Sequence, residues 1–235
     1  MSEVTNNTET TTDVFEFELE WDASGERWFS SGVSRGVLYP MANDGTYDDG
    51  VAWNGLTGVD ENPEGGDTTD LWADNIKYAS FRNPENYGGT IKAYTYPDKF
   101  LPCDGMVEAD GVVFGGQKRM PFGFCYRTEV DNDTGSGKYI LHLVYNCTVS
   151  PSSKSHNTKN ENPDAEEMSW DYKSTPVNVT GVSGVQTTST IELDSRLLSD
   201  AQMLAIEKVL YGYDGSDPTL PDPGTVYSTI QAAAD

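Results

Sequence analysis

The feature that most limits the fold is an alternation of apolar and polar residues with a period of two, which returns in segment after segment. Residues 14–21, VFEFELEW, show it most clearly, with an apolar set on one parity and an acidic set on the other. The apolar set is Phe15, Phe17, Leu19 and Trp21, and the acidic set is Glu16, Glu18 and Glu20. This pattern predicts a β-strand with one buried face. The stripe Glu16, Glu18 and Glu20 must face water or cations, because like charges about 7 Å apart repel one another.

The same period predicts further strands along most of the chain. They are expected at about residues 28–39, 75–81, 90–96, 112–114, 122–130, 138–149, 168–179 and 188–194. In the segment at 138–149, Tyr139, Leu141, Leu143, Tyr145 and Cys147 share one parity. Both parities of this segment are partly apolar, which is typical of a central strand that is buried on both faces.

One helix is predicted at about residues 199–211. Ser199 and Gln202 form a capping-box pattern, and Leu198 and Met203 can form a hydrophobic staple. Gly212 marks the end of the helix. The apolar stripe of this helix is Met203, Ile206 and Leu210.

These elements predict a mainly β protein, a β-sandwich or half-barrel with one flanking α-helix, long loops and extended termini. We expect a single β-rich domain over residues 14–212, after a disordered N-terminus at residues 1–13. The Pro-rich residues 213–235 are expected to form an extended C-terminal arm. The acid-rich residues 57–75 are expected to form a long exposed loop.

The charge of the chain excludes one class of function. The 235 residues carry a formal charge of −23, which argues against binding nucleic acid or an anionic membrane through phosphate contacts. Three cysteines without a C-x-x-C motif, behind a polar N-terminal stretch that does not resemble a signal peptide, indicate a protein of a reducing cytoplasm. No apolar run approaches the length needed to span a membrane.

No catalytic, metal or cofactor motif stands out, so we expect no enzyme activity and no cofactor. The only histidines are His142, in a predicted strand, and His156, in a polar loop. The stretch Asp131–Gly135 hints at the first ligands of a calcium loop. The sixth and twelfth positions of an EF-hand are occupied by Ser136 and His142, so a hairpin turn is favoured and only weak calcium binding stays open.

Several segments come in an order that resembles a known family. In chain order they are GVSRGVLYP (32–40), WNGLTGV (53–59), ADNIKY (73–78), GGTIKAYTYPDKF (88–100), CDG (103–105), PFGFCYRT (121–128), KYILHLVYN (138–146), TTSTIELDS (187–195) and IEKVLYGYDGSDPTLPDP (206–223). Together they resemble the major tail protein of long-tailed bacteriophages, the subunit of the tail tube. The resemblance covers about residues 30–225.

This resemblance implies a structural virion protein whose subunits form hexameric rings that stack into a hollow tube. In the family, the tube surrounds a tape-measure protein, meets tail-tip and tail-terminator proteins at its ends, and conducts DNA to the host. It implies a location in the virion tail, and in the host cytoplasm during assembly. The family has no catalytic or cofactor residues to carry over.

By analogy, the segment 56–74 is the candidate inter-subunit or inter-ring loop. Its candidate residues are Leu56, Asp60, Glu61, Asp67, Asp70 and Trp72. The simpler alternative is a solvated loop. The acidic stripe at residues 16–20 lies before the part that carries the resemblance, and we favour the outer wall or the inter-ring surface for it over the lumen.

The competing interpretation is a surface-binding module, such as an adhesin or a carbohydrate-binding β-sandwich. It would account for the 26 aromatic residues and for the many Asp and Asn residues. It predicts a monomer with exposed aromatic side chains and with a secretion signal or wall anchor.

Overall fold

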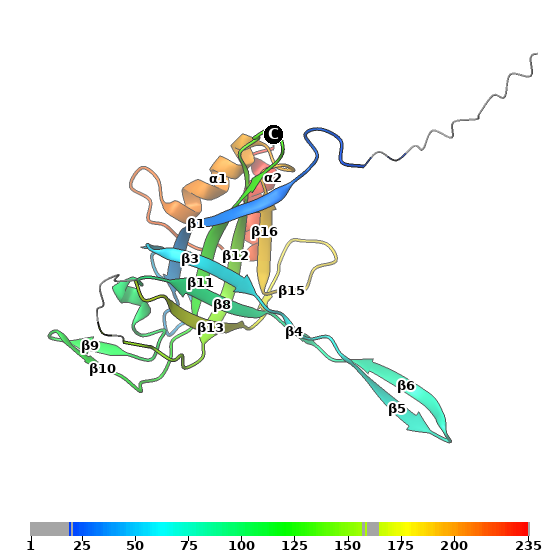
Figure 1. Ribbon diagram of the computed structural model, residues 1–235, viewed down its shortest axis with the longest axis horizontal. Coiled ribbons are helices and arrows are strands. Elements are labelled where there is room, and N and C mark those ends of the chain that lie inside the picture. The colour runs from blue at the N-terminus through cyan, green and yellow to red at the C-terminus, as the bar shows by residue number, and fades with distance from the viewer. Residues whose placement is uncertain (1–18, 20, 157, 159–164, 235) are drawn as a thin grey trace, which may run out of the picture.

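Figure 1 shows the computed structural model, which describes residues 19, 21–156, 158 and 165–234. The strands are β1 (Phe29–Pro40), β2 (Val51–Trp53), β3 (Leu56–Glu61), β4 (Glu64–Gly65), β5 (Thr68–Ala73), β6 (Ile76–Arg82), β7 (Glu85–Asn86), β8 (Gly88–Ala93), β9 (Val107–Ala109), β10 (Val112–Phe114), β11 (Phe122–Asp131), β12 (Lys138–Val149), β13 (Met168–Ser174), β14 (Val177–Asn178), β15 (Thr187–Thr188) and β16 (Thr190–Asp194). The helices are the short 3₁₀ turn η1 (Asp98–Phe100), α1 (Asp200–Tyr211) and α2 (Pro223–Ala232).

One large antiparallel sheet forms the body, in the order β2-β1-β11-β12-β13-β8-β3. β12 also pairs with β16 through Ile140–Val144, and with β13 through its last three residues, so the sheet divides along this long central strand. β2 and β3 are consecutive in the chain yet lie at the two ends of the strand order, so the sheet curls until its ends meet. The mainly β, half-barrel fold with a flanking helix is therefore confirmed.

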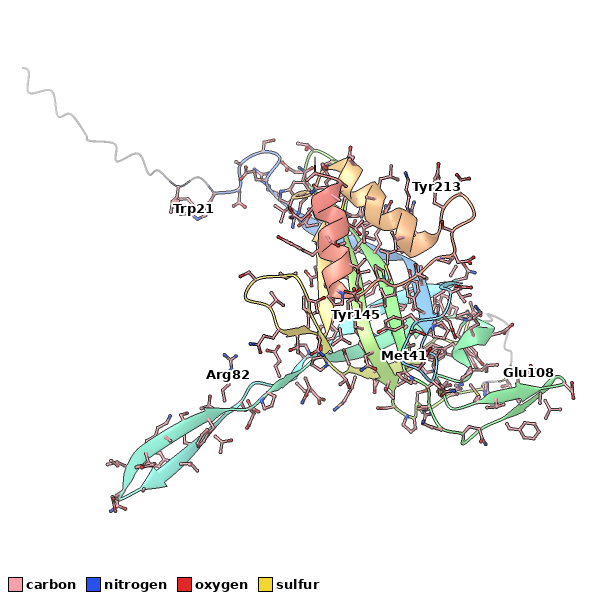
Figure 2. The ribbon with its side chains drawn as sticks, turned by 180° about the vertical axis from the view of Figure 1, so that it is seen from behind. Trp21, Met41, Arg82, Glu108, Tyr145 and Tyr213 are labelled. Atoms are coloured by element: carbon pink, nitrogen blue, oxygen red, sulfur yellow. The ribbon has the colours of Figure 1, made fainter. Side chains whose placement is uncertain are left out.

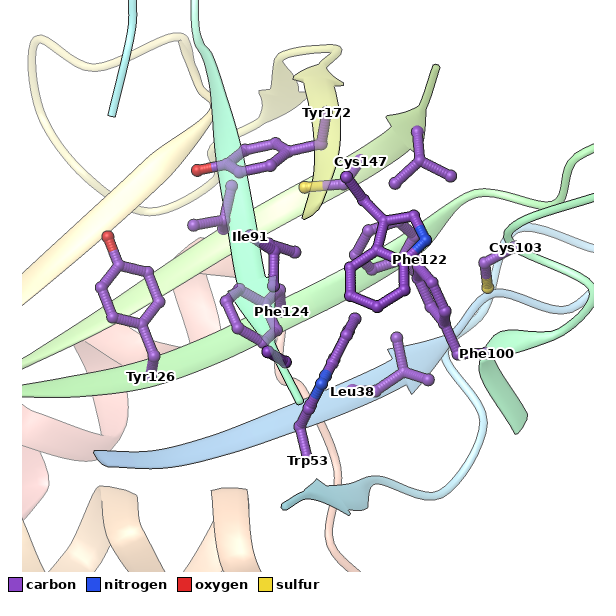
Figure 3. Close-up of a cluster of buried hydrophobic side chains, with 14 residues drawn as sticks. Leu38, Trp53, Ile91, Phe100, Cys103, Phe122, Phe124, Tyr126, Cys147 and Tyr172 are labelled. Atoms are coloured by element: carbon purple, nitrogen blue, oxygen red, sulfur yellow. The ribbon is translucent and has the colours of Figure 1, made fainter. Parts of the chain in front are cut away.

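Two apolar cores lie on the two faces of this sheet. The inner core, inside the curl, is rich in aromatic rings (Figure 3), and the Trp53 and Phe100 rings lie 4.6 Å apart. The outer core lies between the sheet and the helices and contains Met203, Ile206 and Leu210 of α1. Alternation divides β1 between them, because Leu38 enters the inner core while Val37 and Tyr39 enter the outer one.

The parity expected for β12 changes partway along the strand. Leu141, Leu143 and Tyr145 enter the outer core as one set, but Cys147 joins the inner core. The cause is a bulge at Asn146, whose φ is +47°. Three residues of β11, Phe122 to Phe124, lie opposite four of β12, Val144 to Cys147. The grouping of Cys147 with Tyr145 was therefore wrong.

Helix α1 agrees with its sequence signals. The Ser199 hydroxyl accepts a hydrogen bond from the Gln202 amide, and the Gln202 side chain accepts one from the Ser199 amide. Gly212, at φ +77°, ends the helix. All three cysteines are buried and free, as small apolar residues would be.

The C-terminal segment differs from the extended arm that the sequence predicted. Residues Pro223–Ala232 form α2, with Asp222 as its N-cap and Pro223 at its first position. Val226 and Ile230 are buried in the outer core, so this segment belongs to the body. No helix among the described residues has the length and apolar character needed to cross a membrane.

The described end of the strand predicted at residues 14–21 is wrong, because Leu19 and Trp21, expected on its buried face, lie in solvent. Glu16, Glu18 and Glu20 lie outside the described residues. Leu19 and Trp21 are described, and both are exposed and outside any strand.

Candidate assembly interface

A β-hairpin of residues 68–82, hereafter the arm, projects away from the body (Figure 1). It consists of β5 and β6, which pair only with each other. The short ladder of β4 and β7 joins it to the body. The structured arm corrects the prediction that residues 57–75 form a loop, because β3, β4 and β5 occupy most of that range.

The arm forms a hairpin because Asp74 and Asn75, at its turn, tolerate the positive φ angles that a tight turn requires. Asp74 and Asn75 have φ values of +50° and +61°, and Ala73 pairs with Ile76 across them. A two-residue turn with positive φ at both positions matches the right-handed twist of the strands, and Asp and Asn tolerate that conformation. A register shift opposite Leu71 and Trp72 places Tyr78 in a bulge.

The two faces of the arm differ in chemistry. Cross-strand partners share a face, so the register defines an apolar face of Leu71, Ala73, Ile76, Ala79 and Phe81. On the other face, Oδ1 of Asp70 accepts a hydrogen bond from the Ser80 hydroxyl at 2.7 Å and lies 2.8 Å from Nζ of Lys77. Lys77 first, and Ser80 second, hold the pKa of Asp70 below its ordinary value of 3.8.

The apolar face of the arm has no cover among the described residues. Leu71 is 46% exposed, Ile76 62% and Phe81 57%, and Trp72 and Tyr78 are exposed as well. An isolated two-stranded hairpin is marginally stable in water and needs packing partners. The arm is also locally neutral, since residues 68–82 contain two aspartates, one lysine and one arginine in a chain of charge −23. A ribbon with one apolar face and no net charge, on an acidic protein, is suited to contact with another macromolecule.

A second, shorter hairpin repeats this design. β9 and β10 pair with each other across Asp110 and Gly111, which have positive φ values. The register places Val107, Ala109, Val112 and Phe114 on one face, and all four are exposed. In the opposite views of Figures 1 and 2, this hairpin and the arm lie on opposite sides of the body.

The residues predicted for the inter-subunit loop divide between arm and body. Asp67 lies just before the arm, Asp70 is on its polar face and Trp72 is near its tip. Leu56, Asp60 and Glu61 instead belong to β3 in the main sheet. Leu56 packs against the inner core, Asp60 pairs with Lys92 at 2.6 Å, and Glu61 accepts a hydrogen bond from Tyr126.

The turn at Asp131–Gly135 joins β11 to β12, as predicted. Its acidic side chains accept hydrogen bonds from backbone amides. Oδ1 of Asp131 lies 2.9 Å from the Gly137 nitrogen, and Oδ1 of Asp133 lies 2.9 Å from the Gly25 nitrogen. Asn132 accepts from the amides of Thr134 and Ser136. These bonds account for the turn without calcium.

The sequence was compared with protein-family models and with curated proteins, and neither comparison finds a match.

Proposed function

We propose that this chain is a structural, non-enzymatic subunit that assembles with copies of itself into rings, and that the rings stack into the tail tube of a long-tailed bacteriophage. The observation that carries the proposal is the projecting arm with its uncovered apolar face. The half-barrel with a flanking helix agrees with the fold that the sequence resemblance implies.

A second copy is the occupant that we propose for the arm. The arm and the second hairpin are different surfaces on opposite sides of one chain (Figures 1 and 2). Contacts between unlike surfaces are heterologous, and such contacts produce closed rings or open filaments, which are the two geometries that a stacked tube combines. The neutral arm also lets two strongly acidic chains approach with little added repulsion.

The energy of one arm contact indicates that two subunits alone associate weakly. The three large side chains on the apolar face, Leu71, Ile76 and Phe81, are about half exposed or more. At about 1.5–3 kcal/mol for each full burial, covering their exposed halves contributes roughly 2–5 kcal/mol. Association costs roughly 4–15 kcal/mol, so a single contact is weak. In a closed ring each subunit makes two contacts, which favours complete rings over isolated pairs.

The charge suits the role of a DNA conduit. Six copies would carry a formal charge of −138, six times −23. A negative lumen would repel phosphates, so DNA would pass without sticking. In this proposal the partners are other copies of the chain, a tape-measure protein inside the tube, and tail-tip and tail-terminator proteins at its ends. The chain resides in the virion tail and in the host cytoplasm before assembly.

One observation also favours the alternative, a surface-binding module of the adhesin or carbohydrate-binding type. Trp72, Tyr78 and Phe81 on the arm are exposed aromatic rings, and such rings can stack on apolar faces of sugars. That function would use the arm as a monomer, whereas a tube subunit would cover it.

Negative-stain electron microscopy of the purified chain, over a range of protein and salt concentrations, tests the proposal. Rings or tubes of uniform diameter support the tail-tube function. A monodisperse monomer that binds to a glycan array supports the alternative. A monomer at every concentration and salt, with no rings under crowding conditions, contradicts the proposal.

A further inference from the structure

Three side chains with metal-binding atoms meet where β3 ends, outside the arm: Glu61, His142 and Glu192. His142 lies directly opposite Glu192 of β16 and opposite Tyr126 of β11. These three cross-strand partners form a row on one face of the sheet. Glu61, the last residue of β3, reaches the same row from another part of the half-barrel. One atom from each of Glu61, His142 and Glu192 lies within 4.8 Å of the other two.

The imidazole of His142 is held in a fixed orientation. Its side chain is 10% exposed. Nε2 lies 2.8 Å from the Thr128 hydroxyl, and the ring stacks on Tyr126 with a centroid distance of 4.6 Å. These contacts leave Nδ1 facing the two carboxylates.

Nδ1 of His142 has no hydrogen-bond partner among the described residues, although its atom is buried. Oε1 of Glu61 lies 3.5 Å away and Oε1 of Glu192 lies 3.8 Å away, both beyond a good hydrogen bond. When Nε2–H donates to Thr128, the Nδ1 lone pair points at negative oxygens, and this arrangement is unfavourable without a cation.

The surroundings of Glu61 contain further buried polar atoms. The buried hydroxyls of Tyr87, Tyr172 and Thr190 gather beside Glu61, close enough to interact with one another but without a hydrogen bond of good geometry. Burial first, and the charge of Glu61 second, raise the pKa of Tyr87 to about 12. The Tyr126 hydroxyl donates to Oε1 of Glu61 and orients it. Outer hydrogen bonds of this kind position carboxylate ligands in metal sites.

We propose that Glu61, His142 and Glu192 bind a divalent transition-metal ion, and that Zn²⁺ fits this site best. Bonds of about 2.0–2.1 Å in a tetrahedral geometry place neighbouring ligand atoms about 3.4 Å apart. Oε1 of Glu61 and Oε1 of Glu192 lie 3.5 and 3.8 Å from Nδ1 of His142, which is close to this value. The side chains of Glu61 and Glu192 are 34% and 53% exposed, so they can move to close the remaining gap.

The ligand set distinguishes among metals. One imidazole with two carboxylates suits Zn²⁺ and related ions, whereas Ca²⁺ and Mg²⁺ prefer sites made wholly of oxygen. The fourth position would hold water. The bound ion would tie the end of β3, just before the arm, to β12 and β16. This inference does not depend on the proposed function, because it uses only residues of the body.

The test uses the full chain after dialysis against a chelator. Calorimetric titration with Zn²⁺ should give one site per chain, and Co²⁺ should give the absorption bands of a tetrahedral site. Glu61→Gln and Glu192→Gln should each weaken binding by more than the roughly 10–100-fold expected for loss of an outer partner. Tyr126→Phe should weaken it by roughly 10–100-fold. Glu85→Gln, an exposed carboxylate on β7, is the matched control and should bind like the wild type.

Circular dichroism of each variant without metal establishes that the fold is retained. The proposal is overturned if the folded wild type binds neither Zn²⁺ nor Co²⁺. It is equally overturned if Glu61→Gln and Glu192→Gln both bind with unchanged affinity, because the ion would then sit elsewhere.

Discussion

Replacement of Leu71 and Phe81 by serine removes two large side chains from the apolar face of the arm. These side chains are already 46% and 57% exposed, and they lie outside both apolar cores. Exposed substitutions of this kind usually change the free energy of unfolding by no more than about 0.5 kcal/mol each. The body of the Leu71→Ser, Phe81→Ser variant should therefore melt at nearly the wild-type temperature.

The effect on assembly should be much larger. If a neighbouring copy covers the exposed half of each side chain, the lost burial amounts to about 0.7–1.5 kcal/mol per residue, or roughly 1.5–3 kcal/mol per arm. At 1.4 kcal/mol for each tenfold change, every subunit contact weakens by roughly 10–150-fold. A ring contains this contact in every subunit, so the protein concentration needed for assembly should rise steeply.

Sedimentation velocity and negative-stain microscopy over a concentration series measure this shift. The matched control is Val185→Ser with Leu197→Ser, which removes two exposed apolar side chains outside the arm. We expect the control to assemble like the wild type. Identical assembly curves for the arm variant and the wild type would refute the role of the arm, and so would equal impairment of the control.

Further predictions concern the body and its charge. Ile230→Ala should destabilise the fold by about 2–5 kcal/mol in chemical denaturation, whereas Tyr227→Ala on the exposed side of α2 should change little. Tyr39→Phe should cost about 1–3 kcal/mol, because the Leu210 carbonyl would lose the buried hydrogen bond that it accepts at 2.6 Å. The Thr225 hydroxyl and the amides of Thr225 and Gly224 hold the pKa of Asp222 below 3.8. The ionised Asp222 cap therefore stabilises α2 at pH values above the pKa that Asp222 has in the unfolded chain. This stabilisation is lost as the pH falls through the lower pKa that Asp222 has in the folded protein. Asp222→Asn should therefore flatten the acid side of a curve of stability against pH. Raising the salt concentration from 0.1 to 1 M shortens the screening length from about 10 to 3 Å and weakens the repulsion between these acidic chains. Assembly, measured by light scattering, should therefore increase with salt.

The sequence predicted the elements whose patterns are local. Period-two alternation located most strands of the sheet, and the Ser199 capping box located the start of α1. The odd-even assignment failed in β12 because the Asn146 bulge depends on pairing with β11, which no local pattern reports. The α2 helix had a local signal, Asp222 and Pro223 at N-cap and N1, but the prolines before it favoured an extended interpretation.

The candidate interface was only partly predictable. Trp72 and Asp70 were recognised as members of a projecting segment, and both lie on the arm. The apolar face was missed, because it depends on the register between β5 and β6. The Asp74-Asn75 turn between two alternating stretches could have revealed the hairpin.

The metal-ligand cluster was not predictable from spacing. Glu61, His142 and Glu192 come from three strands that are far apart in sequence, and only the fold brings them together. His142 was interpreted as an ordinary strand residue. Its unpaired Nδ1 becomes visible only with the side chains in place.

A cryo-electron microscopy reconstruction of the wild-type chain, assembled at high protein and salt concentration, would show what covers the apolar face of the arm. We expect a closed ring in which a neighbouring copy covers Leu71, Ile76 and Phe81 of every arm. An assembly that leaves this face in solvent, or a protein that stays monomeric throughout, would refute the role of the arm in assembly.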